Sequence, residues 1–134
     1  MNRGVCAAIS GSAPLGAAGG RKRILIVEDE PLSALVLEQE VAQAGCQVVG
    51  PAGDLATACF LACEAHFDAA LLDVNLRGRM SYPVAELLRA RGIPFAFLTG
   101  YAPTLLPPNL QGCLIVQKPA APGQIRRLCA TLVA

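Results

Sequence analysis

The sequence has little charge and few aromatic residues. Charged residues make up 16% of its 134 residues and aromatic residues 4%, and tryptophan is absent. The formal net charge is +1, and the longest basic run is Arg21-Lys22-Arg23. Proteins that bind nucleic acid carry broad basic surfaces, so we expect no direct nucleic-acid binding. No apolar run approaches the roughly 18 residues of a membrane span, so we expect no membrane insertion.

The six cysteines do not form a disulfide or metal-site pattern. Cys46 and Cys113 begin apolar segments, and Cys59, Cys63 and Cys129 lie within segments of helical spacing. Such cysteines behave as small buried hydrophobic residues. Cys59 and Cys63 are one helical turn apart, but no matching second pair follows. We therefore expect a reducing, cytoplasmic location.

The sequence does contain enough apolar residues for one folded domain, since 54% are hydrophobic. Residues 1–20 are rich in glycine, alanine and serine. We expect 1–20 to be a flexible leader and 21–134 to be the folded domain, with no output domain attached. Any partner would then have to be a separate protein.

Five apolar segments alternate with segments of helical spacing. Continuous apolar runs such as residues 23–27 are typical of strands that are buried on both faces of a parallel sheet. Parallel strands need helical crossovers, so the pattern predicts a doubly wound α/β fold with helices on both faces. The expected strands are 23–27, 46–50, 67–73, 94–99 and 113–117, and the expected helices are 32–44, 55–65, 83–91 and 122–133. Pro103, Pro107 and Pro108 predict that the fourth crossover helix is short or broken.

Polar side chains stand where the predicted strands end. Glu28 and Asp29 follow the first strand, Asp73 ends the third, Thr99 ends the fourth and Lys118 follows the fifth. In doubly wound sheets, ligands bind beyond the carboxyl ends of the strands. Any one of these residues alone would be read as a solvated loop residue, but all of them together predict a functional site.

Three carboxylates at one site predict a divalent cation. Packed carboxylates repel each other unless a cation neutralises them. Magnesium, or manganese, prefers oxygen ligands and keeps several waters. We expect Asp29, Asp73 and the backbone carbonyl of Asn75 to supply ligands, and Glu28 to hold a metal-bound water.

A carboxylate neutralised in this way can attack a phosphoryl group. Such transfer depends on positioning and on donors placed around the phosphoryl oxygens. Thr99 can donate its hydroxyl to one oxygen, and Lys118 can pair with another as a point charge. The product would be an acyl phosphate on Asp73.

These residues resemble the response-regulator receiver family over about residues 22–133. Glu28-Asp29 resembles the acidic pair of the family, Asp73 the phosphoacceptor, Thr99 the switch hydroxyl, and Lys118-Pro119 the lysine with its following proline. The resemblance implies a (βα)5 flavodoxin-like fold with strand order 2-1-3-4-5. It also implies a signalling phosphoprotein, not a classical enzyme, that catalyses its own phosphotransfer and dephosphorylation.

Residues 73–78 and 94–101 resemble a subgroup of single-domain receivers. That subgroup is typified by Phe-Ala-Thr-Gly-Tyr after the fourth strand and is common in alphaproteobacteria; here Leu98 replaces the alanine. The resemblance implies that the chain works with HWE-type sensor histidine kinases in stress or light signalling.

One departure from the family concerns switching. Most receivers carry phenylalanine or tyrosine three residues before the lysine, where this sequence has Ile115. We therefore predict that switching runs through Thr99 and the Gly100-Tyr101 loop. Tyr101 is either a surface tyrosine or a shield that overhangs the phosphoryl group and slows its hydrolysis.

The sequence thus predicts a stand-alone response regulator of a two-component phosphorelay, as a monomer or weak dimer. It would take a phosphoryl group from a sensor histidine kinase onto Asp73. It would then act on a downstream regulator or phosphotransfer protein, or serve as a phosphate sink for the kinase.

Two other classes of function compete with this prediction. A phosphorylation-independent adaptor would keep the fold alone, but the presence of Asp73, Thr99 and Lys118 argues against it. A flavodoxin-like redox enzyme would need a loop rich in glycine, serine or threonine after its first strand to hold the FMN phosphate. Glu28-Asp29-Glu30 would repel that phosphate.

Overall fold

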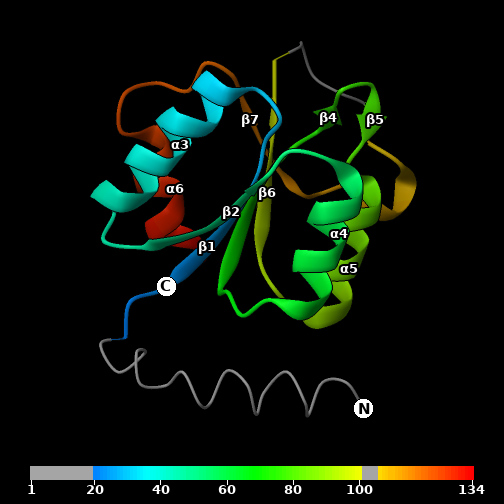
Figure 1. Ribbon diagram of the computed structural model, residues 1–134, viewed down its shortest axis with the longest axis horizontal. Coiled ribbons are helices and arrows are strands. Elements are labelled where there is room, and N and C mark those ends of the chain that lie inside the picture. Colours follow the sequence, from blue (N-terminus) through cyan, green and yellow to red (C-terminus); the bar gives the residue numbers. More distant parts are fainter. Residues whose placement is uncertain (1–19, 101–105) are drawn as a thin grey trace.

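A parallel five-stranded sheet forms the centre of the computed structural model, which describes residues 20–100 and 106–134. Its strands run in the order β2-β1-β3-β6-β7 (Figure 1). Their bounds are β1 Arg23–Val27, β2 Gln47–Ala52, β3 Ala69–Asp73, β6 Phe95–Thr99 and β7 Leu114–Gln117. Counted along the chain, this is the order 2-1-3-4-5, which confirms the predicted fold class.

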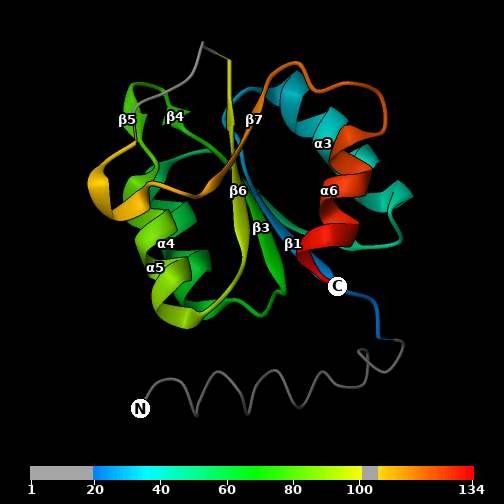
Figure 2. The same cartoon turned by 180° about the vertical axis from the view of Figure 1, so that it is seen from behind.

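Helices cover both faces of the sheet (Figures 1 and 2). Helices α3 (Pro31–Gln43) and α6 (Gln124–Leu132) lie on one face, and α4 (Leu55–Glu64) and α5 (Tyr82–Arg91) lie on the other. No helix in the described part of the chain is long and apolar enough to cross a bilayer.

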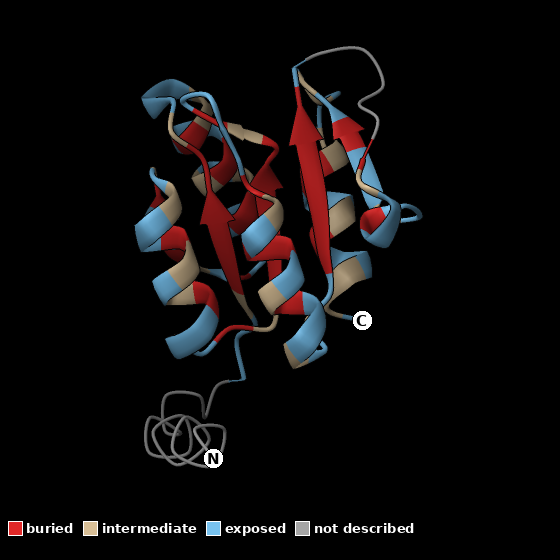
Figure 3. Ribbon diagram, turned by 90° about the vertical axis from the view of Figure 1, so that its right-hand side faces the viewer, coloured by how far each residue is buried: buried red, intermediate tan, exposed pale blue. Residues whose placement is uncertain are grey.

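Alternate residues of the central strands supply two hydrophobic cores. Leu25 and Val27 pack with residues of α4 and α5, whereas Ile24 and Ile26 pack with residues of α3 and α6. This follows from the period of two in a strand, which turns successive side chains to opposite faces. Figure 3 shows the central strands buried and the outward faces of the helices exposed. Only apolar runs tolerate burial on both faces, which is why the strands could be read from the sequence.

Two of the helices begin at acidic caps near the carboxyl edge of the sheet. The Oε1 atom of Glu30 accepts a hydrogen bond from Ser33 N at 2.6 Å, and Pro31 occupies the first helical turn of α3. Asp54 caps α4, and its Oδ1 atom accepts a hydrogen bond from Thr57 N at 2.8 Å. Both caps satisfy backbone donors that helix starts leave open.

The segment 74–81 lies between the expected strand 67–73 and the expected helix 83–91, where the sequence predicts no further strand. It contains an antiparallel hairpin of β4 (Asn75–Leu76) and β5 (Arg79–Met80). The turn residues Arg77 and Gly78 have positive φ angles of 52° and 88°. Two residues per strand are too few to show any periodicity, so the sequence pattern missed the hairpin.

The connection from β6 to β7 has no regular helix in its described part, residues 106–113. It holds the three-residue 3₁₀ helix η1 (Pro108–Leu110), which confirms the predicted short or broken helix. Leu106 and Leu110 are buried against the core. Tyr101 and Pro103 lie outside the described residues. The final helix starts at Gln124 and not at Pro122, because Gly123 takes a left-handed conformation before it.

The predicted burial of the cysteines is confirmed only in part. Cys46 and Cys129 are buried, and burial raises the pKa of Cys129 to about 11. Cys63 is exposed, so the prediction is wrong for it. Helix α4 turns Ala58 and Ala62 toward the core, and Cys63, one residue further on, faces outward.

Candidate functional site

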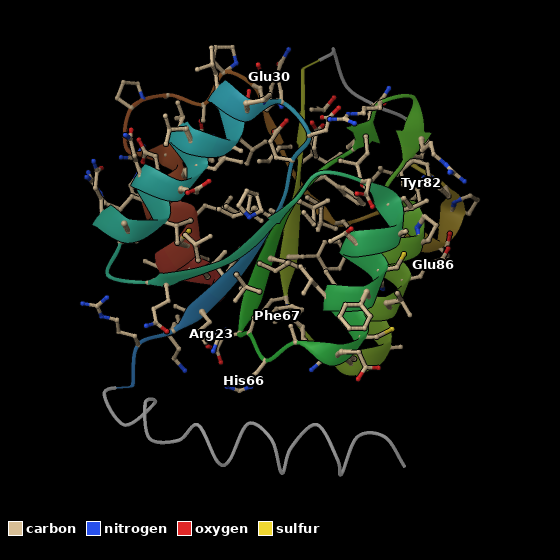
Figure 4. The ribbon with its side chains drawn as sticks, viewed as in Figure 1. Arg23, Glu30, His66, Phe67, Tyr82 and Glu86 are labelled. Carbon is tan, nitrogen blue, oxygen red and sulfur yellow. The ribbon has the colours of Figure 1, made fainter. Side chains whose placement is uncertain are left out.

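The predicted carboxylate, hydroxyl and lysine residues of the site lie at the carboxyl edge of the sheet. Glu28 and Asp29 follow β1, Asp73 is the last residue of β3, Thr99 is the last residue of β6, and Lys118 follows β7. The parallel register aligns these ends, since Asp73 pairs with Leu98 and Thr99 with Gln117. In Figure 4 the labelled Glu30 marks this edge, and His66 lies at the opposite end of the molecule.

Glu28, Asp29 and Asp73 form a compact acidic cluster. One carboxylate oxygen from each lies within 4.8 Å of the other two. Glu28 is 2% exposed and Asp73 is 8% exposed, whereas Asp29 is less buried. Burying several carboxylates together is costly unless positive charge compensates them.

Lys118 supplies part of that positive charge. Its Nζ atom lies 2.8 Å from Glu28 Oε1 and 3.3 Å from Asp73 Oδ2. Burial alone would lower the pKa of Lys118, but the hydrogen bond to Glu28 and the negative charge of Asp73 raise it above its ordinary value. The ammonium therefore stays protonated at neutral pH and links the two carboxylates.

The charge of Glu28 depends on this link. Burial raises the pKa of Glu28, the hydrogen bond from Lys118 lowers it, and the charge of Asp73 raises it again, so the net direction is upward. The backbone N–H of Glu30 also donates to Glu28 Oε2 at 3.1 Å. Glu28 is the member of the cluster that depends most directly on Lys118, because their contact is the shorter of the two that Lys118 makes.

Asp73 is fixed from its backbone as well as from its side chain. The hydroxyl of Ser81 is fully buried and donates to the carbonyl of Asp73 at 2.6 Å. The backbone N–H of Asn75 donates to Asp73 Oδ1 at 3.3 Å. Sequence reasoning missed Ser81, because a serine just before a helix reads as an ordinary cap, and here it makes no capping hydrogen bond.

The cluster fits a hard divalent cation. Its donors are all carboxylate oxygens, and the Asp29 side chain keeps 19% of its surface exposed, which leaves a side of the cluster accessible. Oxygen donors of this kind match magnesium and manganese and not soft metals. Asn75, predicted to offer its carbonyl, lies two residues beyond Asp73 at the start of β4, and its side-chain Oδ1 accepts from Gly78 N at 2.6 Å.

The hairpin places a second cation beside the cluster. Arg77 Nε lies 3.8 Å from Asp29 Oδ2, and the Arg77 side chain is 74% exposed. Sequence reasoning missed this residue as well. The position of Arg77 depends on the tight turn between β4 and β5, and no periodic pattern in the sequence predicts that turn.

The described switch residues lie on β6, on β7 and directly after these two strands. Thr99 is buried, and its carbonyl accepts from Lys118 N at 2.7 Å. The Lys118–Pro119 peptide bond is cis. Ile115 lies on the edge strand β7 with 39% of its surface exposed. Gly100 is exposed, and Tyr101 lies outside the described residues.

A cavity of about 450 Å³ adjoins Lys118 on the α3 side of the sheet. Its walls are mostly apolar and include Leu32 and Val36 of α3, Pro119, and Ile125 of α6. Leu32 and Val36 are largely exposed. The carboxyl edge of the sheet is therefore continuous with an apolar surface at Lys118.

The family model of the response regulator receiver domain matches residues 24–128. The solution structure of SdrG from Sphingomonas melonis Fr1 is 39% identical, with a TM-score of 0.73 over 85% of this chain and 98% of that chain. The receiver domain of the sensor histidine kinase PA1611 from Pseudomonas aeruginosa, solved with a magnesium ion in its active-site cleft, is 26% identical, with a TM-score of 0.69 over 84% of this chain and 98% of that chain.

The response regulator PhyR from Brucella abortus is 30% identical, with a TM-score of 0.69. The match covers 89% of this chain and 53% of PhyR, so this chain is similar to one part of that protein. None of the curated proteins matches the chain.

Proposed function

The chain belongs to the response regulator receiver family, and from this premise we propose that Asp73 accepts a phosphoryl group from a sensor histidine kinase. One observation carries the proposal. Asp73 lies at the end of a central strand, with its carboxylate 3.3 Å from Lys118 Nζ and inside a cluster of three acidic side chains. A nucleophilic carboxylate, a neighbouring cation and a set of hard oxygen donors are the parts that phosphoryl transfer needs.

The residues present fit a magnesium or manganese ion. Asp29 and Asp73 would hold it together with the carbonyl of Asn75, and Glu28 would hold one of its waters. When bound, the ion neutralises the carboxylates and the incoming phosphoryl group. Ser81 and the N–H of Asn75 keep Asp73 in place for the reaction.

The transfer itself exchanges one bond to phosphorus for another. An Asp73 oxygen attacks the phosphorus, the bond from phosphorus to the histidine nitrogen of the kinase breaks, and that nitrogen keeps the electron pair. Lys118 pairs with one phosphoryl oxygen, and the hydroxyl of Thr99 donates to another. Hydrolysis later returns the carboxylate and inorganic phosphate.

The donor is a protein, and two features support this. The apolar cavity beside Lys118 lies between residues of α3 and α6, and a protein surface can pack there. The similarity to the response regulator PhyR also supports a role in phosphorelay signalling. We place the reaction in the cytoplasm, with an HWE-type kinase as donor. The phosphorylated chain then acts on a regulator or phosphotransfer protein, or drains the kinase of phosphate.

The proposal is tested with a small phosphodonor. The chain is incubated with magnesium and acetyl phosphate and weighed intact beside Asp73→Asn, which keeps the size of the side chain. We expect a gain of about 80 Da in the wild type alone. An equal mass gain in Asp73→Asn would show that Asp73 is not the phosphoacceptor.

A phosphorylation-independent adaptor remains the competing function. It predicts that Asp73→Asn binds the kinase and signals like the wild type. Measuring kinase binding and phosphotransfer on the same two proteins separates the two functions.

A further inference from the structure

Arg77 occupies a backbone conformation that arginine rarely adopts. It is the first of two residues that connect β4 and β5, and its φ angle is 52°. Gly78 follows with φ 88°, so both turn residues lie in the left-handed region, as in a type I′ hairpin turn. Such turns favour Asn-Gly or Asp-Gly, and a long side chain at the first position is disfavoured. An uncommon residue held in such a conformation calls for a functional explanation.

The turn holds the guanidinium of Arg77 over the acidic cluster. Its Nε lies 3.8 Å from Asp29 Oδ2. The charge of Arg77 also acts on Asp54, whose pKa is lowered by the hydrogen bonds from Thr57 and, to a smaller extent, by Arg77. Asn75 braces the turn, since its Oδ1 accepts from Gly78 N at 2.6 Å. The hairpin therefore places the positive charge of Arg77 beside the acidic cluster.

Lys118 and Arg77 differ in how freely they can respond to a ligand. The side chain of Lys118 is 24% exposed and contacts both Glu28 and Asp73. The Arg77 side chain is 74% exposed and faces Asp29 at the longer distance of 3.8 Å. A guanidinium in this position can leave Asp29 for a phosphate oxygen, to which it offers a planar fork of donors.

We propose that Arg77 screens Asp29 while the site is empty and binds an oxygen of the incoming phosphoryl group. This inference rests on the proposed function of Asp73. It has two consequences of opposite sign. Loss of the Arg77 charge strengthens binding of magnesium, because the cations compete for Asp29, and it weakens capture of the anionic donor.

Arg77→Asn is the variant that isolates the charge. Asparagine followed by glycine is a favoured pair for this turn, so the hairpin is kept while the charge is lost. Arg79→Gln is the matched control, because it removes one positive charge from the exposed strand β5 of the same hairpin. Arg77→Lys restores the charge without the fork.

Magnesium affinity is measured by isothermal titration calorimetry without any phosphodonor, and the phosphorylation rate is measured by intact mass with acetyl phosphate at saturating magnesium. In Arg77→Asn we expect magnesium to bind about threefold more tightly and the second-order rate constant to fall about threefold to tenfold, both effects shrinking at high salt. In Arg79→Gln both values stay within about twofold of the wild type, and Arg77→Lys lies between.

Other outcomes would overturn the inference. Unchanged values in Arg77→Asn would make Arg77 a surface residue, and a parallel loss of magnesium binding and rate would make it a structural one. If the wild-type chain accepted no phosphoryl group from any donor, the proposed function and the donor part of this inference would both fail. The magnesium affinities would still decide whether Arg77 screens Asp29.

Discussion

The connections that leave the two central strands β3 and β6 are built differently. After β3, the chain forms a hairpin and returns through Ser81, whose backbone N–H and hydroxyl both bind the β3 end, at 2.8 Å to Val74 O and 2.6 Å to Asp73 O. After β6, the described residues 106–113 hold only the short helix η1 and lead to the edge strand β7, where Leu114 and Ile115 are exposed.

This difference matches the two tasks that we propose for the molecule. The connection after β3 holds Asp73, the proposed phosphoacceptor, in one geometry, which phosphoryl transfer requires. The connection after β6 leads from Thr99 to a surface strand with exposed aliphatic side chains. We therefore expect substitutions in the connection after β3 to change chemistry and stability, and substitutions of the exposed residues of β7 to change partner binding with little effect on either.

Among the polar residues of the site, replacement of Lys118 has the largest expected effect on stability. Lys118→Met keeps the aliphatic stem but leaves Glu28 and Asp73 without their cation, so we expect a loss of about 2 kcal/mol at pH 7. The free energy of unfolding is measured in urea, and Lys22→Met is the control because Lys22 is exposed. A loss equal in both variants would contradict the electrostatic account.

The same variant has a pH dependence of defined sign. The pKa of Glu28 is raised in the folded protein, so its ionisation opposes folding, and the stability gained from its protonated form is lost as pH rises. Removal of Lys118 removes a lowering influence on that pKa. The deficit of Lys118→Met relative to wild type should therefore shrink between neutral pH and about pH 5. A deficit that grows on acidification would contradict this reading.

Ser81→Ala has the next largest expected effect. It leaves the carbonyl of Asp73 without its buried donor, which should cost about 1–2 kcal/mol and slow phosphorylation of Asp73. Ser33→Ala is the comparison, since the hydrogen bond of Ser33 to Glu30 uses the backbone N–H and survives the change. Equal stabilities for the two variants would show that the connection after β3 is not held as described.

Ile115→Ala has the smallest expected effect, because Ile115 is 39% exposed on the edge strand. We expect a loss below about 1 kcal/mol and an unchanged phosphorylation rate. The adjacent Val116 is buried on the opposite face, and Val116→Ala should cost about 2 kcal/mol. If Ile115→Ala slowed phosphorylation as strongly as Ser81→Ala, the division between the two connections would fail.

Most of the fold could be predicted because its strands are buried on both faces. The apolar run before Asp73, for example, is typical of a central parallel strand. The ends of such strands then place Glu28, Asp73, Thr99 and Lys118 at one edge of the sheet. The alignment of parallel strands is enough to locate the site at this edge, even when the loop structures are not known.

The structures of the connections could not be predicted, because they depend on individual contacts between a few residues. The hairpin depends on a left-handed pair, Arg77-Gly78, between strands of two residues each. Ser81 acts on a backbone carbonyl eight positions away. Neither produces a periodic pattern in the sequence, so the sequence pointed to Asp73 as the proposed acceptor but not to Ser81 or Arg77 beside it.

Phosphotransfer from a labelled sensor kinase tests the central claim most directly. An HWE-type kinase that carries ³²P on its histidine is mixed with the wild-type chain and with Asp73→Asn in the presence of magnesium. We predict that the label moves to the wild-type chain and stays on the kinase with Asp73→Asn. Binding of both proteins to the kinase without any transfer of label would contradict the phosphoacceptor role and establish the adaptor function.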